Sequence, residues 1–259
     1  MKYVFRLKFL GDKFSGFQSQ KNARTVEDTL RSAVGRIVNT DVRIAGCSRT
    51  DAGVHADEYF ASVSYDKETD VKDMARAVNT YLPDDVAVTD CCPVADGFSL
   101  RRSIIAKTYR YLIRTERFRD PFFISRAAFC PTLGEAAGLD EAAKEFIGTH
   151  DFRAFMATGS DISPDVGRGT VRTVYDCGVK YGDGFIEMSV TADGFLYNMV
   201  RIIAGTLVEH AEGRIGSISD VIASLDRDRA GRTMPAAGLY LHRVYLDAPE
   251  KFRRTLPVR

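Results

Sequence analysis

The sequence predicts an α+β fold of two similar halves, in which strands meet amphipathic helices and two sheets are packed or fused side by side. Two observations support this prediction. Both parts of the chain contain segments in which apolar and polar residues alternate, and both contain segments with apolar residues at helical spacing. A looser stretch with proline and glycine lies between them, so we expect halves at 1–115 and 140–259 and a connecting region at 116–139.

Four strands and two helices are expected in the first half. Apolar side chains alternate with basic ones over residues 2–10, so this strand should have one buried face and one basic face. Residues 25–28 (TVED) resemble a capping box, and the apolar spacing behind it predicts a helix to Val38. Asp70 opens a second helix, which stops before Pro83. The other strands are expected at 42–46, 58–65 and 103–115.

The second half repeats this order of elements in outline, without a repeat at the level of residues. Its elements should be a helix at 140–147, a hairpin of strands at 170–180 and 185–192 around Asp183 and Gly184, an apolar helix at 195–212, a helix at 218–225 and a last strand at 238–247.

The composition is that of an ordinary soluble globular protein, with 45% apolar and 27% charged residues. The N-terminal segment alternates, unlike a signal peptide, and no run of about eighteen apolar residues occurs, so we expect a cytosolic protein with no membrane partner. The five cysteines form no CxxC pair, which argues against a zinc site and for reduced thiols. Because the net charge is only +1, a polyanion would have to bind a local cluster of arginines and lysines.

One short loop, GCSRTDAGVHA at 46–56, collects several chemical groups. Gly53 permits a positive φ, and Asp51 lies at the loop tip, where a ligand could approach. A loop aspartate is most often a turn or cap residue. The joint presence of Arg49, Asp51 and His55 favours a functional site instead. Cys47 is a candidate nucleophile, but a small buried residue is the better interpretation because no base lies near it in sequence.

Residues 49–55, Arg-Thr-Asp-Ala-Gly-Val-His, resemble the signature of the TruA family of tRNA pseudouridine synthases. Other segments resemble further motifs of the family, in the family's order: SGFQ at 15–18, AKTYRY at 106–111, DF at 151–152 with Phe155, RTV at 172–174, GFLYNMVR at 194–201 and AGLYL at 237–241. The family often has tryptophan where this chain has Phe17. The ordered set covers nearly the whole chain and is far more specific than one heptapeptide.

The resemblance implies the pseudouridine synthase fold, with the antiparallel sheets of the two halves forming a continuous central sheet flanked by helices. It also implies isomerisation of uridine to pseudouridine in RNA, in which the N1–C1′ bond breaks, the base rotates and C5 joins C1′. No metal or organic cofactor is implied. The lack of a GxGxxG dinucleotide loop or a GxxxxGK[ST] phosphate loop agrees with this expectation.

The resemblance makes Asp51 the catalytic carboxylate. It can attack C1′ of the ribose, attack C6 of the ring, or stabilise positive charge while a proton leaves C2′, and the sequence does not choose among these routes. Arg201 carries over as its partner, since a guanidinium favours and orients a charged carboxylate. A surface arginine is the alternative, although the apolar helix around it calls for a partner. Tyr109 carries over as the ring beside the target base, and an ordinary core aromatic is the alternative.

Binding of RNA requires further residues. A stacked uridine has to be flipped out, and Arg49 is the candidate for filling the vacated space or holding the flipped phosphate. Leu239 is expected to line the uracil pocket or, equally, to be plain core. Clustered basic residues should supply a cleft for the backbone, although each alone is more often a solvated charge. They are Lys13, Arg24, Arg101, Arg102, Lys107, Arg110, Arg168 and Arg172.

The sequence therefore predicts a tRNA pseudouridine synthase that acts on positions 38, 39 and 40 of the anticodon stem-loop. The family also suggests a homodimer with tRNA as its partner. One alternative is a synthase of the same family with other tRNA positions or another RNA as target. A second is a non-catalytic RNA-binding protein on the same scaffold, which predicts loss of Asp51, Tyr109 or Arg201, all of which are present. A third is an unrelated hydrolase that uses Asp51 and His55.

Overall fold

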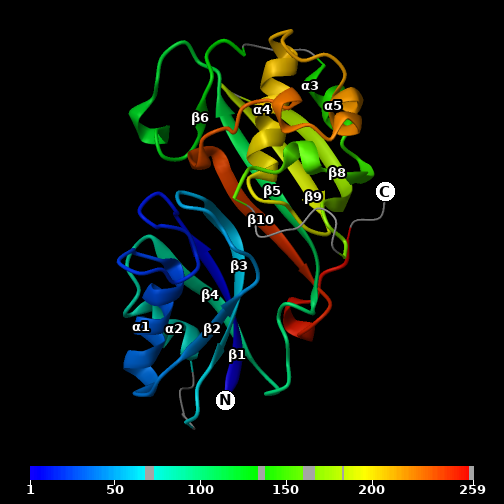
Figure 1. The fold of residues 1–259 in the computed structure, drawn as a ribbon. Helices are drawn as coiled ribbons and strands as arrows, with labels where there is room; N and C mark the ends of the chain where they lie inside the picture. Colours follow the sequence, from blue (N-terminus) through cyan, green and yellow to red (C-terminus); the bar gives the residue numbers. More distant parts are fainter. Residues whose placement is uncertain (68–72, 134–137, 160–166, 183, 257–259) are drawn as a thin grey trace. The chain divides into compact units, whose positions relative to one another are not determined.

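The computed structural model describes residues 1–67, 73–133, 138–159, 167–182 and 184–256 (Figure 1). These residues form two compact units. The first consists of Met1–Ala106 and Tyr240–Arg259, and the second is Lys107–Leu239. The chain passes between the units inside two strands, β5 (Ile104–Arg114) and β10 (Leu239–Leu246). The division into 1–115, 116–139 and 140–259 made from the sequence stays a prediction.

The strands of the first unit are arranged around β3 (His55–Ser64) and β1 (Lys2–Phe9). Strand β1 pairs antiparallel with β3 on one side and with β4 (Val86–Val94) on the other. Strand β2 (Arg43–Gly46) pairs antiparallel with the C-terminal end of β3, and β10 pairs parallel with its first two residues. The order is therefore β4-β1-β3-β10, with β2 on β3. The segment between β2 and β3 emerges at the end of β3 where β10 starts.

The described residues of this unit include the α-helices α1 (Val26–Val38) and α2 (Met74–Asn79). The predicted cap of α1 is present, because the Thr25 hydroxyl accepts the Asp28 backbone N–H and donates to the Asp28 carboxylate at 2.6 Å. The spacing of its apolar residues buries one face, namely Val26, Leu30, Ala33, Val34 and Val38.

The second unit has β9 (Phe185–Ala192) between two antiparallel partners, β5 and β8 (Val171–Gly182). Strand β7 (Gly148–Asp151) pairs antiparallel with β8, and the short β6 (Ala128–Phe129) pairs parallel with β5. The order is β5-β9-β8-β7, with β6 on β5. Its helices are α3 (Leu139–Lys144), α4 (Met199–Ala211) and α5 (Ile218–Ser224).

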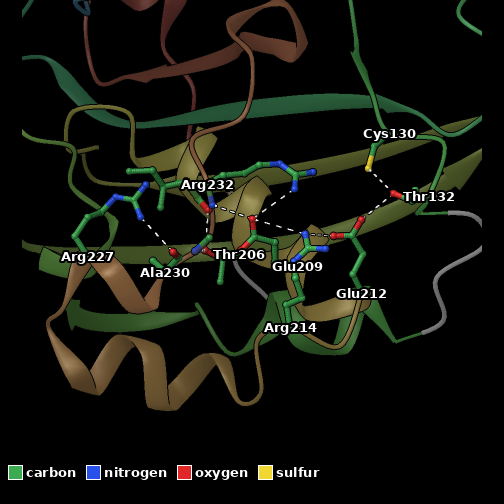
Figure 2. A network of polar contacts seen from close by, with 11 residues as sticks. Cys130, Thr132, Thr206, Glu209, Glu212, Arg214, Arg227, Ala230 and Arg232 are labelled. Atoms are coloured by element: carbon green, nitrogen blue, oxygen red, sulfur yellow. Dashed lines mark hydrogen bonds and ion pairs between the residues drawn. The ribbon is translucent and has the colours of Figure 1, made fainter.

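Helix α4 is mostly buried and is tied to the segment that follows α5 (Figure 2). The Thr206 hydroxyl donates to the Ile202 carbonyl at 2.8 Å and accepts the Gly231 N–H at 2.9 Å. Further along the helix, Glu209 accepts the backbone N–H of Arg232 at 3.3 Å and lies 3.5 Å from its guanidinium. The segment around residues 230–234 is thereby held against α4.

A second part of this network anchors the end of α4 (Figure 2). Glu212 accepts a hydrogen bond from the Thr132 hydroxyl at 2.8 Å and pairs with Arg214, which also lies 3.8 Å from Glu209.

The prediction of an α+β fold with strands and flanking helices in both parts is confirmed, and the strands of each unit pair mainly antiparallel. Strand β4 was not predicted, because Asp90 and Pro93 interrupt its alternation; it lies at the end of the strand order, where a proline is tolerated. Strand β3 begins at His55, three residues before the expected start.

Two helices also start later than expected. The predicted helix at 195–212 begins only at Met199, because Asn198 adopts a left-handed conformation with φ 59°. Helix α2 begins at Met74, capped by Asp73, and the predicted start at Asp70 lies outside the described residues. Asp183, expected in the β8–β9 turn, also lies outside them. Within the described part of the chain, every helix is too short or too polar to span a bilayer.

Candidate active site

The loop that carries Asp51 is held in the first unit by backbone hydrogen bonds at both ends. At its start, the Cys47 N–H donates to the Phe60 carbonyl at 2.8 Å. In its middle, the Thr50 carbonyl accepts the Phe17 N–H at 3.3 Å, and at its end the Gly53 N–H donates to the Phe14 carbonyl at 3.2 Å. The partners belong to β3 and to the segment after β1, so the position of the loop follows from the sheet.

The segment after β1 approaches the loop too closely for a side chain at Gly16. This glycine has φ +94°, and an added Cβ would lie 2.4 Å from the Thr50 carbonyl oxygen. The next residue, Phe17, stacks on Tyr59 with ring centroids 4.4 Å apart, and the Tyr59 hydroxyl donates to the Ser48 carbonyl. The SGFQ segment thus packs against the loop that carries Asp51 and against Tyr59, which binds that loop.

Asp51 itself is half-buried, and its carbonyl accepts the Val54 N–H at 3.2 Å, which closes the turn. Arg49, two residues earlier, is exposed. Cys47 is 5% exposed and its sulfur accepts the Phe60 N–H at 3.4 Å, so it has the environment of a small buried residue.

His55 is a packing residue in this structure. Its side chain is 1% exposed, its Nδ1 accepts the Gly11 N–H at 3.0 Å, and its ring stacks on Tyr240 with centroids 4.6 Å apart. A histidine whose Nδ1 is used as an acceptor for the backbone in the core is poorly suited to serve as a general base. The geometry gives no support to the hydrolase alternative.

In the second unit, Tyr109 lies on β5 and is 6% exposed. Phe195, from the GFLYNMVR segment, packs edge-on against its ring at a centroid distance of 4.9 Å and an angle of 82°. Edge-to-face contact of this kind fixes the orientation of a ring. Tyr109 therefore has a defined position on its strand.

Arg201 lies in the first turn of α4, and two hydrogen bonds orient its guanidinium. Its Nε donates to the Met234 carbonyl at 2.6 Å, and its Nη1 donates to Asn198 Oδ1 at 2.7 Å. The backbones of Arg201 and Met234 are also joined, because the Met234 N–H donates to the Arg201 carbonyl at 3.2 Å. This is a positioned arginine and not a loose surface side chain.

The contacts of Tyr111 place Arg201 and Tyr109 on the same side of the sheet in the second unit. The Tyr111 hydroxyl donates to the Pro235 carbonyl at 2.6 Å, and Pro235 directly follows Met234, which binds Arg201. Tyr109 precedes Tyr111 by two residues and so shares its face of β5. Burial raises the pKa of Tyr111, which is fully buried, so this residue belongs to the core. The convergence of Asp51 with Tyr109 and Arg201 stays a prediction.

Several predicted RNA-binding arginines already have partners within their own unit. Arg24 forms a bidentate pair with Asp85 at 2.8 and 2.9 Å, which raises the pKa of Arg24, and lies 4.0 Å above the Phe14 ring. Arg110 lies 3.3 Å from Glu187. A paired guanidinium has less to gain from a phosphate than one without a carboxylate.

Arg168 and Arg172 are neighbours around Gly194. The Arg168 Nη2 is 2.9 Å from Asp193 Oδ1, and Arg172 donates from Nη1 to the carbonyls of Gly169 and Val171 at 2.9 and 2.6 Å. Arg172 is 7% exposed, and burial together with the charge of Arg168 lowers the pKa of Arg172. Because Asp193 pairs with Arg168, the two arginines together leave one net positive charge at this spot.

The other predicted binding residues differ in exposure. Lys13 and Arg101 are exposed, Lys107 is half-buried, and Leu239 is buried at the start of β10. Their contacts with RNA stay predictions.

The sequence missed the residues that orient the predicted site. Asn198 and Met234 hold Arg201, and Phe195 holds Tyr109, but none of them had a role before the structure. Asparagine directly before an apolar helix was an available signal, because it is one of the few residues that adopt the left-handed conformation readily.

Known proteins resemble this chain over most of its length. The chain matches the tRNA pseudouridine synthase family over residues 7–100 and 142–247. The protein named tRNA pseudouridine synthase A of Ruminiclostridium cellulolyticum is 39% identical over 247 residues, covering 94% of this chain and 99% of that protein. The protein of the same name from Staphylococcus aureus strain MRSA252 is 36% identical over 253 residues, with 96% and 94% covered.

Among solved structures, a Cbf5-Nop10-Gar1 complex aligns with a TM-score of 0.34 and 12% identity over 92% of this chain and 57% of that chain. This likeness is too low to carry an argument.

Proposed function

Because this chain belongs to the tRNA pseudouridine synthase family, it is an RNA pseudouridine synthase, and we propose that it isomerises uridine at positions 38, 39 and 40 in the anticodon stem-loop of tRNA. Asp51 is the catalytic carboxylate in this proposal. The main support is that Asp51 lies in the RTDAGVH segment, in a loop held by backbone contacts to β3 and to the segment after β1. A catalytic group on such a support keeps its position when substrate binds.

The reaction requires three groups with separate tasks. Asp51 acts as the charged carboxylate at the flipped uridine, and Arg201, already oriented by Met234 and Asn198, favours that charged state. Tyr109 presents its ring to the target base. The bond from N1 to C1′ breaks with its electron pair left on N1, the base rotates, and C5 bonds to C1′. C5 then loses its proton and N1 takes up a proton, so that the product is an isomer of the substrate.

The proposal extends to substrate binding. Arg49, exposed beside Asp51, enters the space that the flipped uridine leaves or holds its phosphate, and Leu239 lines the uracil pocket. The exposed Lys13 and Arg101 and the electropositive pair Arg168 and Arg172 bind the backbone of tRNA. Lys107 and Arg110 belong to the same proposed surface, although Arg110 has an ion pair with Glu187. Arg24 contributes least, because its pair with Asp85 is bidentate.

We further propose that the enzyme is a cytosolic homodimer with tRNA as its partner. The family resemblance supports the dimer. The described residues include all five cysteines, and no disulfide joins them, as is usual in a reducing compartment.

The experiment that tests the function measures release of tritium from tRNA labelled at C5 of uridine, followed by mapping of the converted positions. Wild type should release tritium at positions 38, 39 and 40, and Asp51→Ala should bind tRNA but release none above background. Asp41→Ala is the matched control, because Asp41 is an exposed aspartate outside the site, and it should retain full activity. Normal release by Asp51→Ala would disprove the catalytic assignment, and release from other positions would support the alternative target.

A further inference from the structure

The turn that connects β5 and β6 carries the most exposed large apolar side chains in the described residues. We call residues 117–126 (RFRDPFFISR) the aromatic turn. In it, Phe122 is 86% exposed, Phe118 is 72% exposed and Ile124 is 68% exposed. A large apolar side chain that remains in water does not gain the favourable free energy that burial would give. A cluster of such side chains on the surface therefore indicates an interaction surface.

Phe122 is exposed although its backbone is held by hydrogen bonds in an ordered turn. The Asp120 carboxylate accepts the Phe122 N–H at 2.9 Å, and the Asp120 carbonyl accepts the Phe123 N–H at 3.1 Å. Phe123 points inward and packs edge-on against Phe185 at 5.1 Å, with the Arg114 guanidinium 4.7 Å from the Phe123 ring. The anchored Phe123 therefore fixes the adjacent Phe122 in its outward position.

Two guanidinium groups lie next to aromatic rings of this region. The Arg117 guanidinium lies 5.1 Å from the centre of the Phe118 ring, and the Arg119 guanidinium lies 5.5 Å from that of Phe129. Within the described residues, neither arginine has a carboxylate within ion-pair distance. The two nearby carboxylates, Glu116 and Asp120, pair with Arg114 instead. The aromatic turn thus combines exposed rings with unneutralised guanidinium groups.

A hollow of about 210 Å³ opens beside the turn within the second unit. Arg119, Asp120, Ile124 and Phe129 contribute to its walls, and Pro235 and Ala237 contribute from the segment that leads to β10. A planar group could enter between apolar walls here while remaining next to a guanidinium.

These features favour RNA over a second copy of the chain as the occupant. A contact that placed the turn on a twofold axis between copies would bring Arg117 and Arg119 close to the same arginines of the other copy, where like charges repel. RNA supplies the opposite charge together with flat base faces, and aromatic rings combined with arginines are the usual means of binding unpaired nucleotides.

We propose that the aromatic turn is an RNA-binding surface on which unpaired bases of the substrate stack against Phe118 and Phe122, while Arg117 and Arg119 contact the adjoining phosphates. This proposal rests on the proposed function for the identity of the RNA. It assigns the turn a role in affinity only, because its residues lie outside the proposed catalytic groups.

The test compares tRNA affinity and saturated turnover in the full-length protein. Each ring replaced by alanine should weaken tRNA binding about tenfold, the effect expected for one stacked base. Turnover at saturating tRNA should not change. Phe122→Trp should keep the affinity because it offers a larger stacking face, whereas Phe122→Leu should lose it despite remaining apolar. Tyr175→Ala, which removes another exposed aromatic residue, is the matched control and should bind as wild type does.

Two results would overturn the proposal. One is unchanged affinity in Phe118→Ala/Phe122→Ala, and the other is a smaller oligomer of that variant in sedimentation, which would make the turn a subunit interface. Neither depends on catalysis, since affinity and oligomeric state are measured without turnover. Absence of turnover in wild type would contradict the proposed function instead, so the two failures are distinguishable.

Discussion

At the scale of single residues, the structure shows how the predicted arginine is held. Arg201 donates to the carbonyl of Met234 and to the amide of Asn198, and the left-handed Asn198 begins the turn from which α4 starts. An arginine fixed in this way loses little conformational entropy when it pairs with a carboxylate. Asn198 is therefore a positioning residue for the proposed reaction.

We expect Asn198→Gly to lower kcat roughly tenfold to a hundredfold with little change in KM, because glycine keeps the left-handed backbone but removes the acceptor that orients Arg201. Asn198→Asp retains that acceptor and should recover most of the activity. Arg201→Leu should lose more turnover than Asn198→Gly while still binding tRNA. Steady-state kinetics with tRNA and a binding measurement check these expectations, and normal kcat in Asn198→Gly would remove the proposed role.

At the scale of elements, α4 depends on close approach to the segment after α5. An added Cβ at Gly205 would lie 1.8 Å from the Arg232 carbonyl oxygen, which is shorter than any non-bonded contact allows. The hydrogen bond from Gly231 to Thr206 and the contacts of Glu209 with Arg232 close the same interface (Figure 2). This interface also places Met234 beside Arg201, so packing and site geometry are linked.

Gly205→Ala should lower the free energy of unfolding by about 1–3 kcal/mol, the usual cost of overpacking, since the neighbour is backbone and yields little. Denaturant unfolding followed by circular dichroism measures this change. Gly216→Ala is the control, because a Cβ there meets no atom within 4 Å, and its effect should stay within about 0.5 kcal/mol. Equal stability of the two variants would contradict the steric argument.

At the scale of the whole molecule, a net charge of +1 means that tRNA binding depends on where the cations lie and which of them are neutralised. The sequence assigned Arg24 and Arg101 to the same surface. In the structure the two arginines differ in ion pairing. Arg24 has a bidentate partner in Asp85, whereas Arg101 is exposed and has no ion pair among the described residues.

Arg101→Gln should therefore weaken tRNA binding and reduce the slope of log affinity against log salt concentration by about one. Arg24→Gln should leave that slope nearly unchanged and instead lower stability, because it leaves Asp85 unpaired. Titrations of tRNA at several salt concentrations distinguish the two variants. Equal slopes for both would show that ion pairing does not decide which arginine contacts RNA.

The sequence by itself determined the features that depend on neighbours along the chain. Alternation at 2–10, the capping residues before α1 and the apolar spacing of α5 each predicted the correct element, because periodicity is a local property. The order of the motifs, led by RTDAGVH at 49–55, predicted the family in the same way. The apolar spacing predicted the wrong start for α4, because one residue overrides it. The left-handed backbone of Asn198 prevents the helix from beginning at residue 195.

Only the tertiary structure decided which distant groups meet. Nothing along the chain pairs Arg24 with Asp85 or gives Arg201 the carbonyl of Met234, and of two adjacent phenylalanines only the fold decides that Phe123 is anchored and Phe122 is presented to solvent. Each of these pairings joins segments that are distant in sequence. The path of the backbone through the sheet sets the distances between these segments, and this path cannot be predicted from the residues of one segment alone.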